Sequence, residues 1–452
     1  MKSPIAVVVL AAGAGTRMKA AVPKVLHPLA GWPMVRHVLE NAARLKPARI
    51  VGVVAPGAKD VAAAFAPHPT VVQRKPRGTG DAVKAALPAL QGHRGLVLVV
   101  FGDAPLITTA TLRPLVESCR KARATVGVLG FTARDPTPYG RLIVRDGMLE
   151  RIVESRDAND TERTVDFCNS GVMCIDGALI GSLLGAIRNH NVKNEFYLTD
   201  AVAAARAAGH TAIAVEGDEA EFQGINCRAE LAVAEKALQM RLRAAAFEAG
   251  VSMTDPDTVW LAADTKLSAD VTIGPNVRFG TGVSVGAGSK ILAFCDIEGV
   301  RIGRNVRIGP FARIRPGSEV GDEVHIGNFV ELKATRMGRG AKANHLAYLG
   351  DSDIGAESNI GAGTIAVNYD GYGKWRTVIG ADVFVGSNSS LVAPVRLGRR
   401  ANVAAGSVGT EDAPARAVGF GRARPPAKKG RAAALRAKLK ARAAAAKRTR
   451  KK

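Results

Sequence analysis

Hydrophobic positions in the first half of the chain alternate between two patterns. Residues 5–10, 50–54 and 95–101 form short, continuous apolar runs, which predict buried strands. Residues 31–45 and 80–90 carry apolar positions at helical spacing. This alternation predicts an α/β domain with a mostly parallel sheet and helices on both faces. In such sheets, ligands bind beyond the carboxyl ends of the strands.

A long helix is predicted over residues 228–248, where this alternation ends. Leu231, Ala234, Leu238 and Leu242 fall on one stripe of it, and Gly250 follows as a stop. We interpret this helix as a connector between two domains.

Beyond the connector, an aliphatic residue recurs at every sixth position. Two long runs show the period: Ile302, Ile308, Ile314, Val320, Ile326; and Ile379, Val385, Leu391, Leu397, Val403. A six-residue repeat is typical of a parallel β-helix, in which each flat face uses one hexapeptide. The phase is lost between Met337 and Asp353, so we expect residues 338–348 to leave the coil as a loop.

These patterns divide the chain into four segments. They are an α/β domain over 1–228, a helical linker over 229–250, a β-helix over 251–426 and a tail over 427–452. The net charge is +23, and 14 basic residues with no acidic ones lie from residue 421 onward, which leaves +9 for the remainder. The tail predicts a disordered or transiently helical, solvated arm that catalysis does not need. No aromatic residues interleave its charges, so nucleic acid is not expected as a partner.

The cysteine pattern and the length of the apolar runs indicate the compartment in which the protein is expected. The five cysteines are scattered and form no Cys-x-x-Cys pair, which argues against a disulfide framework and against a structural zinc site. No apolar run approaches the roughly 18 residues of a membrane span. We therefore expect a cytoplasmic protein without a membrane segment.

A glycine-containing loop directly follows the first predicted strand. Gly13 and Gly15 permit backbone amides to approach phosphate oxygens, and Arg17 and Lys24 add positive charge. The third glycine of a dinucleotide-binding fingerprint is absent, and no Walker pattern follows. Alone, this loop is equally compatible with an ordinary strand-to-helix turn.

Further motifs near this loop favour a phosphate-binding role over an ordinary strand-to-helix turn. Leu10-Ala-Ala-Gly-Ala-Gly-Thr-Arg-Met18 with Pro23-Lys24-Val25-Leu26 resembles the sugar-1-phosphate nucleotidyltransferases. With the hexapeptide half, residues 5–424 resemble the bacterial bifunctional N-acetylglucosamine-1-phosphate uridyltransferases/glucosamine-1-phosphate acetyltransferases. The resemblance implies a Rossmann-like domain joined to a left-handed β-helix, synthesis of UDP-N-acetylglucosamine, and homotrimers whose acetyl sites are shared between β-helices.

The resemblance also implies residue roles in the first domain. Asp103 and Asn226 would hold Mg²⁺, and Arg17 and Lys24 would assist uridylyl transfer. Gln73, Gly78 and Thr79 would contact uracil, and Gly140, Glu154 and Asn169 would contact the sugar. The full set of UTP and sugar contacts would be Leu10, Ala11, Ala12, Gly13, Lys24, Gln73, Gly78, Thr79, Phe101, Gly102, Asp103, Gly140, Glu154, Asn169 and Asn226. Individually, Asp103 is also compatible with a turn cap, Asn226 with a helix cap, Glu154 with a surface carboxylate and Asn169 with a turn.

For the β-helix, the resemblance implies acetyl transfer from acetyl-CoA, with His345 as the general base. A base is chemically required because the substrate amine is largely protonated at neutral pH. Arg315 and Lys333 would contact the sugar phosphate, and the other substrate contacts would be Tyr348, Asn359 and Lys374. The acetyl-CoA contacts would be Ala362, Asn368, Tyr369, Ser387, Ala405 and Arg422.

Other interpretations remain open at this stage. One is a nucleotidyltransferase with a single activity and a β-helix that only assembles copies. Another is a non-catalytic subunit that combines the same two folds. Lys24, Asp103 and Asn226 argue against the second, and the segment around His345 argues against the first.

Overall fold

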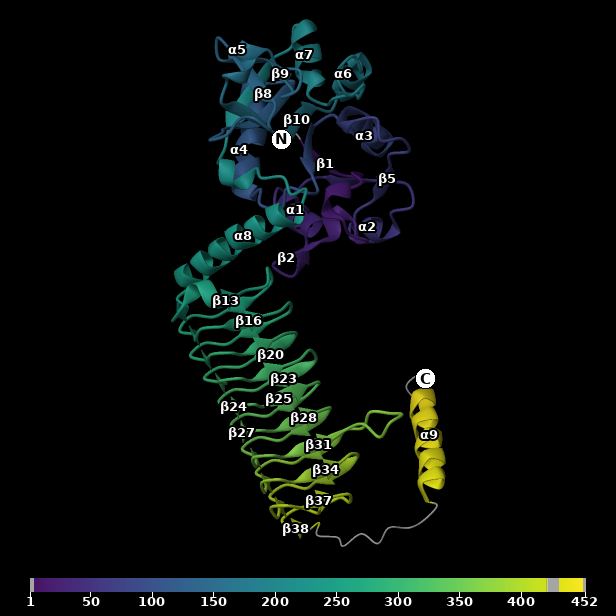
Figure 1. Ribbon diagram of the computed structural model, residues 1–452, viewed down its shortest axis with the longest axis vertical. Helices are drawn as coiled ribbons and strands as arrows, with labels where there is room; N and C mark the ends of the chain where they lie inside the picture. Colours follow the sequence, from purple (N-terminus) through teal and green to yellow (C-terminus); the bar gives the residue numbers. More distant parts are fainter. Residues whose placement is uncertain (1–3, 420, 422–430, 450–452) are drawn as a thin grey trace. The chain divides into compact units, whose positions relative to one another are not determined.

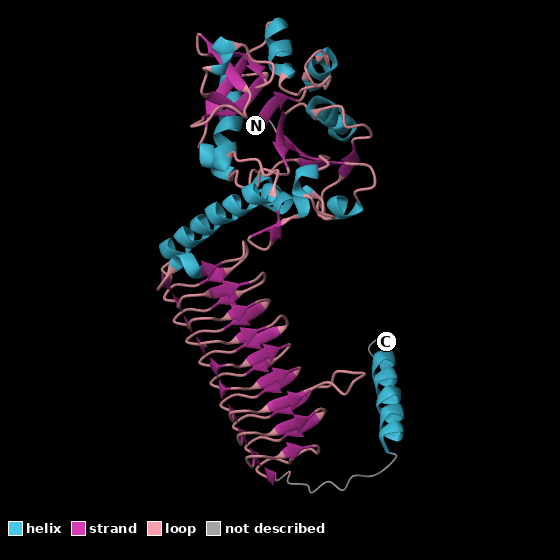
Figure 2. Ribbon diagram, viewed as in Figure 1, coloured by secondary structure: helices cyan, strands magenta, loops and turns pink. Residues whose placement is uncertain are grey.

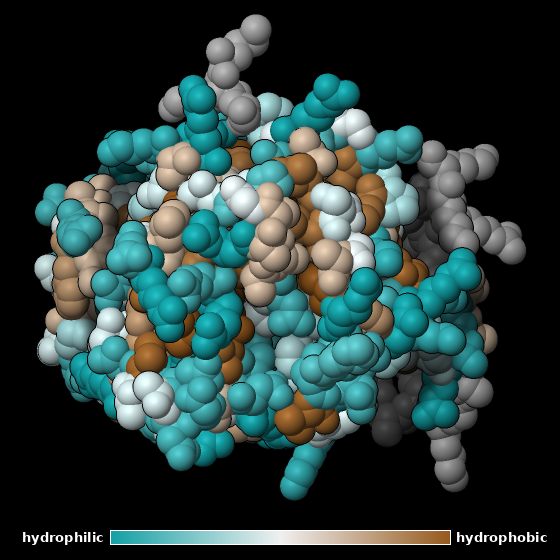
Figure 3. All heavy atoms as spheres, turned by 90° about the horizontal axis from the view of Figure 1, so that it is seen from above, coloured by the Kyte–Doolittle hydropathy of each residue, from teal (hydrophilic) through white to brown (hydrophobic). Residues whose placement is uncertain are grey.

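The computed structural model describes residues 4–419, 421 and 431–449; in the last helix, side chains are described for residues 434–445. The chain divides into two compact units, Met1–Leu238 and Gln239–Lys452. Figures 1 and 2 show an α/β fold for the first unit and a stack of short strands for the second. No helix among the described residues is long and apolar enough to cross a membrane. The surface in Figure 3 is largely hydrophilic, and hydrophobic residues show through only in separate patches.

The first unit is built on one mixed sheet. Its strand order is β11-β7-β10-β6-β1-β4-β5, and β10 is the strand that runs antiparallel to both neighbours. The bounds are β1 (Ile5–Ala11), β4 (Arg49–Val54), β5 (Thr70–Val72), β6 (Leu96–Phe101), β7 (Val126–Thr132), β10 (Phe167–Asp176) and β11 (Ala212–Glu216). The hairpin β8 (Arg141–Arg145) and β9 (Met148–Val153) joins through β10, and β2 (Pro28–Leu29) pairs separately with β3 (Trp32–Pro33).

Helices pack against both faces of this sheet, so its central strands are buried on both sides. Alternate residues of β1 pack into two different clusters, Val7 and Val9 into one and Ala6 and Val8 into the other. The first cluster includes α1 (Met34–Ala43), α2 (Lys59–Ala63) and α4 (Thr109–Ala122). The second includes α3 (Thr79–Ala86), α6 (Ile180–Ala186) and α7 (Asp200–Ala207). A short helix, α5 (Asp160–Arg163), follows the β8–β9 hairpin.

The long helix α8 spans Arg228–Glu248, as its apolar stripe predicts. Its beginning belongs to the first unit, where Ala234 packs with Leu29, Met34 and Ile225. Its end belongs to the second unit, where the Gln239 amide exchanges two hydrogen bonds with the Leu261 backbone.

The second unit is a β-helix with three parallel sheets, one on each face. The first face holds β12 (Ser252–Met253), β15 (Thr272–Ile273), β18 (Lys290–Ile291), β21 (Arg307–Ile308), β24 (His325–Asn328), β27 (Lys342–His345), β30 (Asn359–Ile360), β33 (Phe384–Val385), β36 (Asn402–Val403) and β38 (Val418–Gly419). The second face holds β13 (Val259–Trp260), β16 (Val277–Phe279), β19 (Asp296–Ile297), β22 (Arg313–Ile314), β25 (Glu331–Lys333), β28 (Tyr348–Gly350), β31 (Ile365–Val367), β34 (Ser390–Val392) and β37 (Val408–Gly409). The third face holds β14 (Lys266–Leu267), β17 (Ser284–Val285), β20 (Val300–Ile302), β23 (Ser318–Val320), β26 (Arg336–Met337), β29 (Ser352–Ile354), β32 (Thr377–Ile379) and β35 (Val395–Leu397).

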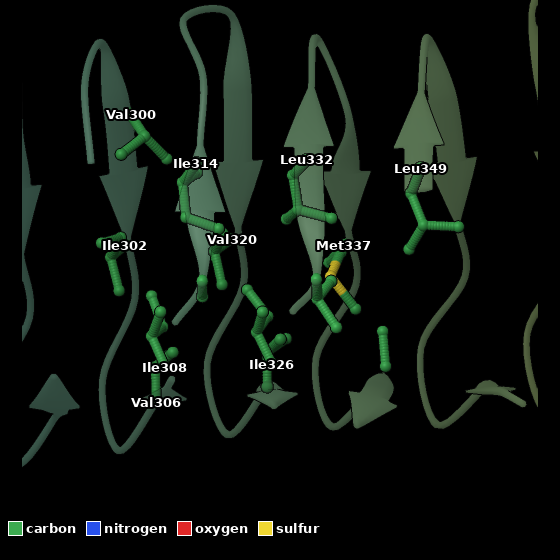
Figure 4. Close-up of a cluster of buried hydrophobic side chains, with 14 of the residues drawn as sticks. Val300, Ile302, Val306, Ile308, Ile314, Val320, Ile326, Leu332, Met337 and Leu349 are labelled. Carbon is green, nitrogen blue, oxygen red and sulfur yellow. The ribbon is translucent and has the colours of Figure 1, made fainter. Parts of the chain in front are cut away.

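The aliphatic repeat forms the core of this β-helix. Figure 4 shows side chains of successive coils, among them Ile308, Ile314 and Ile326, directed into the interior. Ile308 and Ile326 are in register on the first face and are fully buried. One aliphatic residue per face and coil therefore builds a continuous hydrophobic column.

The prediction that residues 338–348 leave the coil is wrong. Strand β27 pairs with β24 and β30, and the inward Ala343 and Leu349 are both fully buried. The phase shifts because only five positions separate Leu332 from Met337, and again Leu349 from Ile354. A corner shortened by one residue moves the sequence phase while the strands stay stacked.

The segment that does leave the coil lies later, between β31 and β32. Tyr369 and Lys374 form an isolated antiparallel bridge, so residues 368–376 make a hairpin, which projects from the stack in Figure 1. Because of these extra residues, Ile354 and its register partner Ile379 are further apart in sequence than register partners in coils without the hairpin.

The tail was expected to be disordered or transiently helical, and solvated. Residues Arg431–Thr449 form helix α9, which agrees with the helical alternative and with the high helix propensity of alanine, lysine and arginine. It is not wholly solvated, because Arg442 covers the ring of Trp375 at 4.1 Å and Ala443 is buried.

Candidate active sites

The glycine loop follows the end of β1 and has one position that requires glycine. Gly15 has a φ of 61°, and a Cβ there would lie 2.5 Å from the Cβ of Lys24. Gly15 therefore lets the segment that carries Lys24 approach the loop. Gly13 is exposed, and a Cβ there would meet nothing within 4 Å, which leaves its backbone open to a ligand. Arg17 is exposed on η1 (Thr16–Met18).

Three predicted residues from distant parts of the chain meet at this loop. Lys24 lies on η2 (Lys24–Leu26), Asp103 follows β6, and Asn226 precedes α8. The Lys24 ammonium forms an ion pair with Asp103 and donates a hydrogen bond to the Asn226 Oδ1 at 3.2 Å. The Asp103 carboxylate and the Asn226 amide oxygen thus share one cation position. The Ile225 amide donates to the Asp103 carbonyl oxygen at 3.0 Å and holds the two segments together.

The structure also distinguishes between the two interpretations of Asn226. The Asn226 backbone amide donates to the Glu230 carboxylate at 2.5 Å, while its side-chain oxygen faces Lys24. The Asn226 side chain is therefore directed to the site rather than to the first turn of α8.

The predicted uracil contacts form a separate cluster. Gln73 is buried and donates from its Nε2 to the Gly78 carbonyl oxygen at 3.1 Å. The Thr79 hydroxyl accepts a hydrogen bond from the Leu198 amide at 3.0 Å. Gly78 has a φ of 111°, and a Cβ there would lie 2.5 Å from the Phe196 carbonyl oxygen. Segment 196–198 therefore supports the predicted uracil contacts, a role that sequence reasoning did not assign.

The remaining predicted nucleotide contacts line the end of the sheet. Leu10 and Ala11 are buried at the end of β1, and Ala12 is half-buried beside them. The Gly102 amide donates to the Leu10 carbonyl oxygen at 2.9 Å, which ties the end of β6 to that of β1. Phe101 is half-buried.

The predicted sugar contacts are also brought together. The Asn169 amide donates to the Gly140 carbonyl oxygen at 2.8 Å, and its side-chain oxygen accepts from the Gly171 amide at 2.9 Å. A Cβ at Gly140 would lie 3.6 Å from the Glu154 Oε2. The Thr199 hydroxyl donates to the Glu154 Oε1 at 3.2 Å.

Glu154 lies in an acidic environment that sequence reasoning missed. Burial raises the pKa of Glu154. Burial, together with the charges of Glu154 and Asp157, raises the pKa of Asp200 to about 6. A perturbed carboxyl group beside a predicted ligand contact is typical of a functional site. Asp200 ends the segment Glu195-Phe-Tyr-Leu-Thr-Asp200, which is part of the family resemblance, but the sequence assigned no role to its carboxyl group.

In the β-helix, His345 lies at the end of β27 and not in a loop. It is exposed, and its Nδ1 lies 2.6 Å from the Oδ1 of Asn328. Asn328 is the register partner of His345 in the preceding coil. An amide oxygen only accepts hydrogen bonds, so the imidazole Nδ1 carries the proton and Nε2 presents its lone pair. Asn328 was not predicted, because its partner lies one coil away.

The predicted phosphate contacts form a charged network on the second face. Arg315 donates to the Glu331 carboxylate at 3.0 Å, and Lys333 donates to the Asp351 carboxylate at 2.9 Å. Asn368, predicted as an acetyl-CoA contact, also donates to Asp351, at 2.5 Å.

The lysines of this network perturb one another. Burial disfavours the charged form of Lys333, but its hydrogen bonds, first that to Asp351, outweigh burial and raise the pKa of Lys333. The neighbouring Lys333 lowers the pKa of Lys374. Two adjacent ammonium groups repel each other until an anion binds, so the pair is suited to a phosphate.

Tyr348 packs into the same network. A Cβ at Gly350 would lie 2.6 Å from the Tyr348 hydroxyl and 2.7 Å from the Asn368 Nδ2, so glycine is needed between them. Tyr369 lies on the hairpin, and its hydroxyl donates to the Gly371 carbonyl oxygen at 2.8 Å.

The other predicted contacts lie on or beside the first face. Asn359 is on β30, and Ala362, Ser387 and Ala405 follow β30, β33 and β36 at successive turns. Arg422 lies outside the described residues.

Comparisons with known proteins agree with both halves. Residues 7–167 match the MobA-like NTP transferase domain, residues 299–334 the bacterial transferase hexapeptide, and residues 376–410 the hexapeptide repeat of succinyl-transferase. The bifunctional protein GlmU of Paramagnetospirillum magneticum is 52% identical over 91% of this chain and 92% of its own length. GlmU of Rhodospirillum rubrum is 55% identical over 87% and 88%, and GlmU of Gluconacetobacter diazotrophicus is 52% identical over 97% and 95%. With one nucleotidyltransferase domain and one hexapeptide transferase domain in a single chain, the protein belongs to the bifunctional GlmU family.

Proposed function

We propose that this enzyme makes UDP-N-acetylglucosamine in two steps. The β-helix transfers an acetyl group from acetyl-CoA to glucosamine-1-phosphate, and the α/β unit then transfers uridylyl from UTP to the product. The observation that carries the proposal is that one GlmU-like chain contains both constellations, Lys24 with Asp103 and Asn226, and His345 with the Lys333 network.

In the α/β unit, the sugar phosphate oxygen attacks the α-phosphorus of UTP and pyrophosphate leaves. The nucleophile is already ionised, so the protein needs to position the phosphates and neutralise their charge. Lys24, Arg17 and the open backbone at Gly13 supply positive charge and amide donors. Gln73 and the Gly78–Thr79 segment bind uracil, and Glu154, Asn169 and Gly140 bind the sugar.

Mg²⁺ fits the residues present. The Asp103 carboxylate and the Asn226 amide oxygen converge on one cation position, which the Lys24 ammonium shares. One or two protein oxygens suit Mg²⁺, which retains most of its waters. When bound there, the ion would neutralise charge on the triphosphate.

In the β-helix, the amine nitrogen attacks the thioester carbonyl carbon, the carbon–sulfur bond breaks, and the departing CoA sulfur takes up the proton that His345 accepts from the amine. His345 accepts the amine proton at Nε2, because Asn328 holds Nδ1 protonated. Arg315, Lys333 and Lys374 bind the sugar phosphate, and Tyr348 and Asn359 orient the sugar. Ala362, Asn368, Tyr369, Ser387, Ala405 and Arg422 contact acetyl-CoA.

We further propose that the enzyme is a homotrimer. Tyr348 and Lys333 point outward from the second face, whereas Asn359 points outward from the first. Adjacent faces of a three-sided coil are directed away from each other, so one small sugar cannot contact both sets within a single chain. A second copy whose first face approaches this second face completes the site.

Both reactions are assigned to the cytoplasm. The support is the cysteine pattern, since all five cysteines are free, as expected in a reducing compartment.

The test supplies the purified chain with glucosamine-1-phosphate, acetyl-CoA, UTP and Mg²⁺, and follows UDP-N-acetylglucosamine, CoA and pyrophosphate. Omitting acetyl-CoA should stop product formation unless N-acetylglucosamine-1-phosphate is supplied. Uridylyl transfer without any CoA release would refute the acetyl half and favour a β-helix that only assembles copies.

A further inference from the structure

The side-chain amide of Gln73 is held in one orientation. Its nitrogen, Nε2, lies 3.1 Å from the Gly78 carbonyl oxygen and 3.2 Å from the Asp81 Oδ2. Both neighbours are acceptors and Gln73 is only 7% exposed, so this end of the amide is the NH2 group and both of its hydrogens are used. In the reverse orientation, the Gln73 oxygen would face two acceptors in a place with little access for water.

This orientation leaves the Gln73 oxygen, Oε1, as the group that can face a ligand. Among the described residues, no donor forms a hydrogen bond to Oε1, and the atom is not sealed from solvent. A ligand that binds here therefore needs an N–H or O–H group opposite this oxygen.

The carboxylate of Asp81 is anchored on its other side by Arg77. The Arg77 Nη2 donates to the Asp81 Oδ1 at 3.0 Å, so the two carboxylate oxygens serve different partners. Arg77 itself lies over the ring of Phe196 at 5.6 Å, and its carbonyl oxygen accepts from the Phe196 amide at 2.7 Å. Asp81 is in the first turn of α3, where an acidic side chain stabilises a helix. The hydrogen bonds to Gln73 and Arg77 give this carboxylate a further role.

We infer that Asp81 is a positioning residue that makes the uridylyl site select uracil over cytosine. The inference rests on the proposed function, in which Gln73 contacts the uracil of UTP. The only N–H of that base is at N3, whereas N3 of cytosine carries a lone pair. An amide oxygen accepts from the uracil N3–H and repels the cytosine lone pair. A Gln73 side chain that cannot turn over therefore admits one base and rejects the other.

A carboxylate suits this position better than an amide would. Asp81 has an acceptor at each end, so it accepts from Arg77 and from Gln73 at the same time. An asparagine has a single oxygen, and the guanidinium of Arg77, which only donates, would hold it. The asparagine NH2 would then face Gln73 and favour the reverse orientation of its amide. In that orientation Gln73 presents its NH2 to the base, which suits N3 of cytosine.

The test compares UTP with CTP as the nucleotide donor for the full-length chain. Pyrophosphate release at saturating N-acetylglucosamine-1-phosphate and fixed Mg²⁺ gives kcat/KM for each nucleotide. The variants are Asp81→Asn, Arg77→Ala and the two combined. Asp60→Asn is the matched control, because Asp60 is an exposed acidic residue in the first turn of another helix, α2.

We expect the parent chain and the control to prefer UTP by about 10²-fold or more. Asp81→Asn should reduce this ratio at least about tenfold, as expected when a hydrogen bond to a charged group is lost. Arg77→Ala should keep the ratio within about threefold, because an exposed ion pair contributes little and the carboxylate still accepts from Gln73. The double variant should regain most of the ratio, because the asparagine can then turn its oxygen toward Gln73.

A purely structural role for Asp81 would lower kcat/KM for both nucleotides equally, and an unchanged ratio in Asp81→Asn would overturn the inference. A double variant as unselective as Asp81→Asn would also contradict it. If Asp81→Asn does not fold, Asp81→Ala removes the acceptor without turning a donor toward Gln73, and its ratio is judged in the same way. A parent chain that transfers no uridylyl group from UTP would refute the proposed function instead, and equilibrium binding of UTP against CTP would still test Asp81.

Discussion

Removal of the Asn328 amide tests how His345 is prepared for catalysis. The Asn328 oxygen accepts the imidazole Nδ1–H at 2.6 Å and thereby keeps the Nε2 lone pair available. Asn328→Ala removes this acceptor and leaves His345 free to rotate and to change tautomer. We expect slower acetyl transfer with an unchanged KM for acetyl-CoA.

The magnitude follows from the hydrogen bond. A neutral hydrogen bond contributes about 1 kcal/mol and one to a charged group about 1.5–3 kcal/mol. Imidazolium develops as the amine loses its proton, so the bond strengthens toward the charged value. At about 1.4 kcal/mol per tenfold, kcat should fall between about 5-fold and 100-fold. His345→Ala removes the base and should cost about 10²- to 10⁴-fold.

The assay is CoA release at saturating substrates as a function of pH, with uridylyl transfer as the internal control. The variant Asn328→Asp keeps an acceptor but adds a charge that favours imidazolium. It should retain most of kcat while the acidic limb of its pH profile moves to higher pH. The double variant of Asn328 and His345 should be no slower than His345→Ala, because both act through one group. Full activity in Asn328→Ala, or an additional loss in the double variant, would refute the assignment.

Other substitutions test the remaining parts of the chain. Asp103→Asn should raise the barrier to uridylyl transfer by several kcal/mol at fixed Mg²⁺ and leave CoA release unchanged; normal uridylyl transfer would place the metal elsewhere. Cys295→Ala should leave acetyl transfer within about twofold, since burial raises the pKa of this thiol to about 11 and a protonated thiol is a poor nucleophile; loss of activity in the folded variant would indicate a thiol carrier. Asp200 has a raised pKa of about 6, so its native form holds the proton more tightly than the unfolded chain, and its contribution to stability is lost as pH rises through 6. Asp200→Asn should therefore raise Tm at pH 7 but not below pH 4, and an equal shift at both pH values would contradict the burial of this charge. Deleting residues 428–452 should preserve uridylyl transfer but raise the KM for glucosamine-1-phosphate severalfold, because Arg442 covers Trp375 beside Lys374; an unchanged KM would return the tail to the dispensable arm that the sequence predicts.

The periodicity of the hydrophobic residues was sufficient to predict the architecture of both units. The alternation of apolar runs and helical segments predicted the α/β unit, and the six-residue repeat predicted the β-helix, in agreement with the matched families. Both patterns are local, because each depends only on residues within a few positions of one another in the sequence. The same holds for α8, whose stripe gave its bounds.

The contacts between side chains within the two sites could not be predicted from such local patterns. Lys24 and Asn226 are 202 positions apart, and only the folded sheet brings them together. Asn328 is separated from His345 by one coil, a distance that depends on how many residues each corner uses. The resemblance selected the predicted ligand contacts, but it did not reveal the groups that hold them, such as Asn328, Thr199 and Gly350.

The shortened corners explain why His345 was misplaced, and they bear on its chemistry. Reading a strict period of six past Met337 puts the next residues out of phase, which resembles a loop. In the structure, the five-residue step from Leu332 to Met337 leaves Ala343 in register with Ile326, so the coil continues beneath His345. A base on a paired strand is held by two neighbouring coils, whereas a base in a loop must be ordered when substrate binds. The strand position therefore favours a preorganised site.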